Sequence, residues 1–134
     1  MDRVLIVHTS WYKNYISEMV DIAIKSLKNK YEVNIAIAPG SIELAALAKN
    51  KINKRKYVGI LFIGIVIRGE TSHYDLVTNE TFRSIGSLAE NFCDLAIINN
   101  VICVENENQL KERFSKVTFN NTNALMDLMN EKSS

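Results

Sequence analysis

A histidine, two hydroxyl residues and a glycine stand together directly after the most apolar stretch of the chain. The segment reads IRGETSHYD from residue 67 to residue 75. Ser72 and Asp75 have the spacing of a helix-capping pair, so a helix is expected to begin here. The free amides of a helix start favour an anion, Gly69 allows a tight turn, and Thr71 adds a second hydroxyl. His73 can exchange protons near neutral pH. The group suits a small phosphorylated substrate; the alternative is a well-capped turn with a surface histidine.

Three further residues outside this segment could also contact a ligand. Trp11 and Tyr12 follow an apolar run and offer an aromatic face for a flat heterocycle, or simply pack against the protein. Glu43 follows Pro-Gly and could bind a polyol or complement a helix dipole. His8 ends the first apolar run and fits a structural role better than a catalytic one.

The elements that must position these residues follow from hydrophobic periodicity. Apolar or alternating runs predict strands, and apolar residues at helical spacing predict helices. Asn29 is expected to adopt the left-handed conformation after the first helix, Ser41 to cap the second, and the Asn99-Asn100 pair to interrupt the last strand. The expected strands are residues 3–8, 32–38, 57–67 and 95–104, and the expected helices are residues 14–27, 42–53, 76–91, 107–115 and 121–130.

This alternation predicts one three-layer α/β domain over residues 1–134, with a four-stranded parallel sheet. The run at 57–67 is apolar throughout, as expected for a strand that helices cover on both faces. Ligands of open parallel sheets bind beyond the carboxyl ends of the strands. The residues after the first three strands, and those near the end of the fourth, should therefore share one rim.

Composition narrows the function classes. The chain has 134 residues, 47% of them hydrophobic and 23% charged, with a net charge of +1. Neither a nucleic-acid partner nor a membrane partner is expected, because no basic surface, signal peptide or membrane-length apolar run is apparent. Cys93 and Cys103 lie in apolar contexts and are predicted to be buried thiols in the reducing cytoplasm. Neither a Gly-rich nucleotide loop nor the acidic pair of a phospho-acceptor domain is present.

The motifs resemble those of the 6,7-dimethyl-8-ribityllumazine synthase family. Residues 64–77, GIVIRGETSHYDLV, followed by Asn79-Glu80, are similar to the family signature G-x-V-I-R-G-x-T-x-H-x-D-x-V-x-x-E. Residues 38–44, APGSIEL, are similar to V-P-G-A-F-E-[IL], and residues 107–113 are similar to a T-x-E-Q-A-x-x-R segment. The resemblance covers nearly the whole chain in order.

The resemblance implies a flavodoxin-like sandwich that assembles into homo-oligomers, as pentamers or multiples of pentamers, with a possible riboflavin synthase partner. The implied reaction condenses 5-amino-6-(D-ribitylamino)uracil with 3,4-dihydroxy-2-butanone 4-phosphate in riboflavin biosynthesis, without a metal or redox cofactor. A catalytically weak relative that binds flavin or lumazine, or serves as an assembly scaffold, is the alternative.

The resemblance also implies a role for each matching residue. Tyr12, or Trp11 if the loop is shifted by one position, would stack on the pyrimidine, and His73 would transfer protons. Arg113 would reach the phosphate from a neighbouring subunit. The ribityl chain would meet Ser41, Ile42 and Glu43, the ring pocket would be lined by Ile65, Val66 and Ile67, and the phosphate would be held by Gly69, Glu70, Thr71 and Ser72.

The chain departs from the family pattern in three places. Ile42 replaces a phenylalanine. Asn99 replaces an aromatic residue that stacks from the neighbouring subunit, unless a shorter loop puts Ile102 there. The glycine- and lysine-rich stretch that follows the arginine in the family is poorly kept at residues 114–121, where Lys116 stands for the first lysine. These changes bear on substrate affinity more than on the type of reaction.

Overall fold

A computed structural model describes residues 1–69 and 72–134 of the chain. Strands and helices alternate along it, and the predicted bounds agree with the observed ones to within a few residues for most elements. The elements are β1 (Arg3–His8), α1 (Lys13–Leu27), β2 (Glu32–Ile37), the short 3₁₀ helix η1 (Ser41–Glu43), α2 (Leu44–Ile52), β3 (Gly59–Ile67), α3 (His73–Asn91), β4 (Ala96–Val104) and α4 (Glu107–Ser133).

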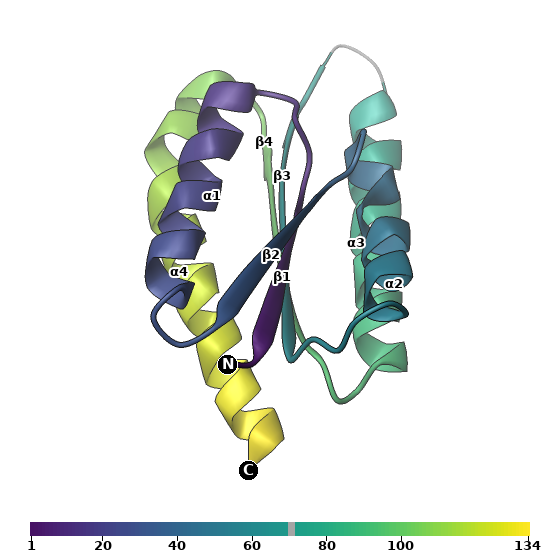
Figure 1. Ribbon diagram of the computed structural model, residues 1–134. Coiled ribbons are helices and arrows are strands. Elements are labelled where there is room, and N and C mark those ends of the chain that lie inside the picture. Colours follow the sequence, from purple (N-terminus) through teal and green to yellow (C-terminus); the bar gives the residue numbers. More distant parts are fainter. Residues whose placement is uncertain (70–71) are drawn as a thin grey trace.

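The four strands form one parallel sheet in the order β2-β1-β3-β4. Helices α1 and α4 cover one face of the sheet, and α2 and α3 cover the other (Figure 1). The chain first adds β2 on one side of β1 and then crosses to add β3 on the other side. This reversal and strand order are those of flavodoxin-like folds, so the predicted three-layer architecture is confirmed.

The core consists of two apolar layers, one on each face of the sheet. Val4 and Ile6 of β1 pack among residues of α1 and α4, whereas Leu5 and Val7 pack among residues of α2 and α3. All residues of β3 from Gly59 to Ile65 are buried, as the continuous apolar run predicts for a central strand covered on both faces. The sheet thus provides a rigid base for the segments at its carboxyl edge. In the described residues, no helix is long and apolar enough to span a membrane.

A buried polar network joins β4 to α4. Asn100 is 1% exposed, its Nδ2 donates to Thr118 Oγ1 at 2.9 Å, and Asn121 Nδ2 donates to Asn100 Oδ1 at 2.8 Å. The prediction that Asn99-Asn100 interrupts the strand is therefore wrong, because α4 supplies the hydrogen bonds that let a polar side chain enter the core.

The same network explains why the two helices predicted at the C-terminal end are one. Thr118 and Thr122 lie on the buried face of α4, which runs unbroken from Glu107 to Ser133. Asparagine and threonine, here Asn121, Thr118 and Thr122, are poor helix formers. Burial against β4 outweighs these small local preferences.

Replacing Asn100 with alanine should therefore destabilise the fold. The change removes one buried and one partly buried hydrogen bond and leaves polar atoms of Thr118 and Asn121 without these partners. We expect a loss of about 2 kcal/mol in the free energy of unfolding, measured by urea titration at one fixed protein concentration. Asn108→Ala, on the exposed surface of α4, is the matched control. A loss below about 0.5 kcal/mol for Asn100→Ala would show that the network contributes nothing.

Two other sequence predictions are wrong. Helix α1 ends in the right-handed conformation at Lys28, whose amide donates to Ile24 O at 2.9 Å, and Asn29 has no positive φ. Cys93 is exposed rather than buried, because it follows the end of α3 at the surface. Cys103 is half-buried on β4, and this burial raises the pKa of its thiol to about 11.

Candidate active site

Three loops and the first turn of α3 surround a pocket of about 420 Å³ at the carboxyl edge of the sheet. This is where ligands of open parallel sheets bind. Its apolar floor is the end of β3, and its rim carries aromatic, carboxylate and imidazole groups. The lining residues are Trp11, Tyr12, Gly40, Ser41, Ile42, Glu43, Ile65, Val66, Ile67, Gly69, His73, Tyr74 and Val77.

The turn after β1 presents both aromatic candidates to the pocket. Tyr12 has φ 61° and ψ 53°, and it is the one non-glycine residue with positive φ in the described parts of the chain. This left-handed conformation is unfavourable for a bulky residue, but the Tyr12 carbonyl accepts from the amides of Tyr15 and Ile16 and so starts α1. The Trp11 indole donates to Pro39 O at 3.1 Å, which ties the first loop to the second. Both residues line the pocket, so either of them is a candidate for the stacking residue.

The second loop places Ser41, Ile42 and Glu43 along the pocket in the short helix η1. Ser41 lies inside this turn and makes no capping hydrogen bond among the described residues, so its predicted capping role is wrong. Gly40 has a structural reason to be glycine: a Cβ at this position would come within 2.8 Å of Glu43 Oε1. The missing side chain therefore lets the Glu43 carboxylate lie close to the backbone.

The floor of the pocket is the last part of β3. Ile65 is 3% exposed, whereas Val66 and Ile67 are half-buried. Ser41 of the second loop lies close to this strand, since a Cβ at Gly64 would be 3.5 Å from Ser41 Oγ. An apolar strand surface bordered by backbone groups suits a flat ring better than a charged group.

Helix α3 begins at His73, which is exposed and lines the pocket. Ser72 precedes it in the right-handed conformation and makes no side-chain capping bond in the described residues, so the predicted Ser72–Asp75 capping pair is wrong. Asp75 instead faces Arg68, with 3.6 Å between its Oδ1 and Arg68 Nη2. The first amides of α3 therefore lack a capping side chain from Ser72, which is compatible with an anionic ligand at this end.

The phosphate segment predicted from the sequence is only partly described. Gly69 lines the pocket and has no positive φ, and a Cβ there would meet nothing within 4 Å. Ser72 stands beside the pocket without lining it. Glu70 and Thr71, predicted to hold phosphate, lie outside the described residues.

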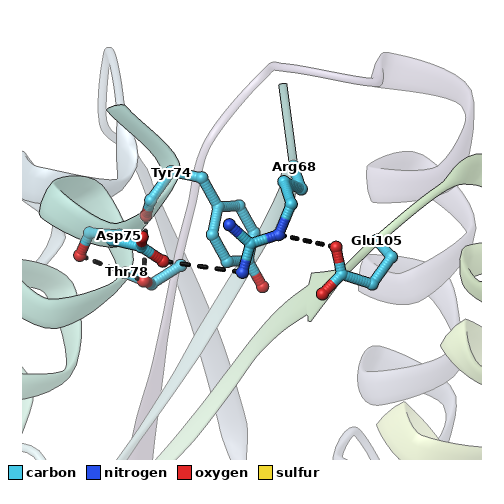
Figure 2. A network of polar contacts seen from close by, with 5 residues as sticks. All are labelled: Arg68, Tyr74, Asp75, Thr78 and Glu105. Carbon is cyan, nitrogen blue, oxygen red and sulfur yellow. Dashed lines mark hydrogen bonds and ion pairs between the residues drawn. The ribbon is translucent and has the colours of Figure 1, made fainter. Parts of the chain in front are cut away.

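The Arg68 guanidinium connects three segments of the chain next to the pocket (Figure 2). Arg68 Nε donates to Glu105 Oε2 at 2.6 Å, and the guanidinium carbon lies 4.4 Å from the centre of the Tyr74 ring. The Glu105 carboxylate raises the pKa of Arg68, and burial raises the pKa of the Tyr74 hydroxyl. Both groups therefore keep their protons at neutral pH, and Arg68 keeps its positive charge.

Sequence reasoning missed Gly40, Tyr74 and Val77 as pocket residues. The signal for two of them was present, because positions 73, 74 and 77 share one face at the start of a helix. The sequence prediction used this helical spacing only for the capping pair Ser72–Asp75, so it did not place Tyr74 and Val77 in the pocket.

Besides Ser72, Asn99 and Arg113 are predicted site residues that do not line this pocket in the described part of the chain. Asn99 is half-buried on β4, and its side-chain oxygen accepts from Val101 N at 2.8 Å. Ile102, the alternative to Asn99, is buried in the core with 7% exposure. Arg113 is exposed on α4, which covers the opposite face of the sheet from α3 (Figure 1). Within one chain, the pocket therefore contains the groups predicted for the ring and the ribityl chain but not Arg113.

The strand order and the position of the pocket define a flavodoxin-like α/β protein with a small-molecule site at the carboxyl edge of its sheet. Comparison with known proteins gives the family. Its sequence model, described as 6,7-dimethyl-8-ribityllumazine synthase, matches residues 2–132. The chain therefore belongs to the 6,7-dimethyl-8-ribityllumazine synthase family, whose members are transferases of riboflavin biosynthesis, and it is an enzyme of that class.

Individual relatives support the same assignment. A 6,7-dimethyl-8-ribityllumazine synthase of Bartonella tribocorum is 37% identical over 113 residues, which cover 83% of this chain and 74% of that protein. Enzymes of the same name from Neisseria gonorrhoeae and Neisseria meningitidis are each 30% identical over 118 residues, which cover 85% of this chain and 74% of each of those proteins.

Proposed function

We propose that this enzyme condenses 5-amino-6-(D-ribitylamino)uracil with 3,4-dihydroxy-2-butanone 4-phosphate to give 6,7-dimethyl-8-ribityllumazine, with release of phosphate and water. One observation carries the proposal. Motif residues from three separate segments line a single pocket: the aromatic pair Trp11-Tyr12, the Glu43 loop, and His73 at the start of α3.

The pocket suits the two halves of the first substrate. The pyrimidine would lie on the apolar end of β3 and stack against Tyr12 or Trp11. Its ribityl hydroxyls would point toward Ser41 and Glu43, since a carboxylate accepts hydrogen bonds from a polyol. Ile42 would contact the chain through apolar surface.

The phosphate of the second substrate would bind at the start of α3. The free amides of the first turn and the positive end of the helix dipole favour an anion, and Gly69 leaves room for it beside the backbone. Ser72, with Glu70 and Thr71, would complete this side. Arg113 of a neighbouring subunit would bind the phosphate from the other side, where its planar guanidinium can donate two hydrogen bonds.

The chemistry needs orientation and proton transfer rather than a covalent enzyme intermediate. Holding the amine beside the ketone in one pocket contributes up to about 7–11 kcal/mol in ideal cases. His73 lines the same pocket and would move protons during imine formation and phosphate elimination. The amides of the α3 start and Arg113 would stabilise the charge on the departing phosphate.

Assembly is part of the proposal, because Arg113 lies away from its own pocket. We propose a homopentamer or a multiple of it, in the cytoplasm, with riboflavin synthase as a possible partner. Exposed large apolar side chains, among them Ile35, Ile37 and Phe119, support contacts between copies. The mass of the native particle should then be five times 15.2 kDa or a multiple of that value.

The test is direct synthesis. Purified protein of known particle mass receives both substrates, and the growth of lumazine absorbance is recorded, with the ketone lacking its phosphate as the control. We expect product with the phosphorylated ketone and a much slower rate with the control. Pure, folded protein that makes no lumazine would refute the proposal, and tight binding of riboflavin in that case would indicate a flavin- or lumazine-binding relative.

A further inference from the structure

Arg68 is held from three directions at the point where the pocket meets the start of α3 (Figure 2). Its Nε donates to Glu105 Oε2 at 2.6 Å, and its Nη2 lies 3.6 Å from Asp75 Oδ1. Its planar face covers the Tyr74 ring at 4.4 Å. Its backbone amide donates to Val104 O at 2.9 Å, so the side chain extends from a point fixed to β4.

These contacts join elements that are far apart in the sequence. Arg68 follows β3, Tyr74 and Asp75 belong to the first turn of α3, and Glu105 lies between β4 and α4. The Glu105 amide donates to Gln109 Oε1 at 2.8 Å, so this carboxylate stands on the ordered start of α4. The guanidinium therefore connects the first turn of α3 to the carboxyl ends of β3 and β4.

The charges around Arg68 argue against a role as a phosphate ligand. Two carboxylates already face the one guanidinium, so its positive charge is more than balanced before any substrate arrives. The side chains of Arg68, Asp75 and Glu105 are 40%, 59% and 54% exposed, and ion pairs this exposed contribute little to overall stability. The cluster instead fixes the orientation of the Arg68 guanidinium. This planar group is bound at its edge by the carboxylates and on its face by the Tyr74 ring.

We propose that Arg68 is a positioning residue for the reaction, an inference that rests on the proposed function. By holding the Tyr74 ring and the Asp75 carboxylate, it sets the position of the first turn of α3 relative to β3. His73 starts that turn, and both His73 and Tyr74 line the pocket. Arg68 acts through these two residues and does not itself line the pocket in the described part of the chain.

The kinetic test compares Arg68→Gln and Arg68→Lys with Arg83→Gln. Arg83 is the matched control, because it pairs with Glu80 on the same helix and lies outside the pocket. Small displacements of a reacting group cost rate rather than affinity, so we expect kcat to fall about tenfold in Arg68→Gln, with each KM changed less than about twofold. Arg68→Lys should not restore kcat, because an ammonium cannot cover the Tyr74 ring and bind both carboxylates as a plane does.

A second readout does not depend on activity. The Leu76 amide donates to Ser72 O at 3.3 Å, which is part of the first turn of α3. Hydrogen exchange at Leu76 and Val77 should quicken about tenfold in Arg68→Gln, while exchange in the later turns of α3 and throughout Arg83→Gln stays unchanged. If Arg68→Gln does not fold, Glu105→Gln replaces it in both measurements. This variant removes the charge of the closer carboxylate without changing the size of the side chain, and we expect the same fall in kcat and the same faster exchange.

The outcomes separate this inference from the proposed function. Both a lower kcat and faster exchange are required. A higher KM for the phosphorylated ketone at unchanged kcat would mean that Arg68 binds phosphate, and a lower melting temperature at unchanged kcat would mean that it only stabilises the fold. Either result overturns the inference, as does a change in one readout without the other. A wild-type enzyme that makes no lumazine would instead refute the proposed function, and exchange alone would then decide whether Arg68 holds the turn.

Discussion

Replacing His73 with alanine should lower kcat for lumazine formation by about 10²–10⁴-fold, the usual contribution of a positioned general acid–base group. His73 is exposed at the first residue of α3 and lines the pocket beside Tyr74. Imine formation and phosphate elimination both need protons moved, and an imidazole does this near neutral pH. Because the side chain is not part of either core layer, the melting temperature should stay the same.

The matched control for this variant is the second histidine of the chain. His8 is half-buried at the end of β1, where its Nδ1 lies 2.7 Å from Thr9 O, and it does not line the pocket in the described part of the chain. His8→Gln removes an imidazole from the same edge of the sheet and should leave kcat within about twofold of the wild type. An unchanged rate in His73→Ala would remove the role assigned to that residue.

Replacing Arg113 with alanine should raise KM for the phosphorylated ketone by about a hundredfold, because a hydrogen bond to a charged group contributes about 1.5–3 kcal/mol. Arg113 is exposed on α4, away from the pocket of its own chain. The loss should therefore appear as weaker phosphate binding at a site between two subunits. Binding of 5-amino-6-(D-ribitylamino)uracil, which has no phosphate, should change little.

Lys111 provides the control for Arg113. It is an exposed cation two residues away on the same helix and pairs with Glu107 one turn earlier. Lys111→Ala changes the net charge by the same amount, so it accounts for any long-range electrostatic effect. Equal KM values for the phosphorylated ketone in the wild type and Arg113→Ala would exclude a phosphate contact, and equal losses in the two variants would point to general charge rather than a specific bond.

The fold was largely predictable because its strongest signals are local. The apolar run that became β3 and the helical spacing of α1 each indicate one kind of element. Alternation of strands and helices then permits few topologies. The C-terminal part could not be predicted in the same way, because Asn100 and Thr118 are favourable only in contact with each other. Single-sequence periodicity carries no information on such pairs.

In the candidate site, too, local motifs could be found in the sequence, whereas contacts between distant segments could not. Residues in specific motifs, such as Glu43 and His73, were predicted from spacing and line one pocket. The capping role of Ser72 was wrong, and Asp75 instead faces Arg68, which follows β3. The contact between Asp75 and Arg68 joins segments that local preference does not relate. Tyr74 was missed for a different reason, because the helical spacing was used only for the capping pair.

Mixed oligomers test most directly the central claim that one pocket uses His73 of one subunit and Arg113 of its neighbour. The His73→Ala and Arg113→Ala chains would be co-expressed with different tags, and the particles carrying both tags isolated. If neighbours share sites in a closed ring, about a quarter of the sites regain both groups under random mixing, and activity at low ketone phosphate should rise well above that of either variant alone. If Arg113 instead served its own chain, every site would lack one group, and mixed particles no more active than the single variants would contradict the claim.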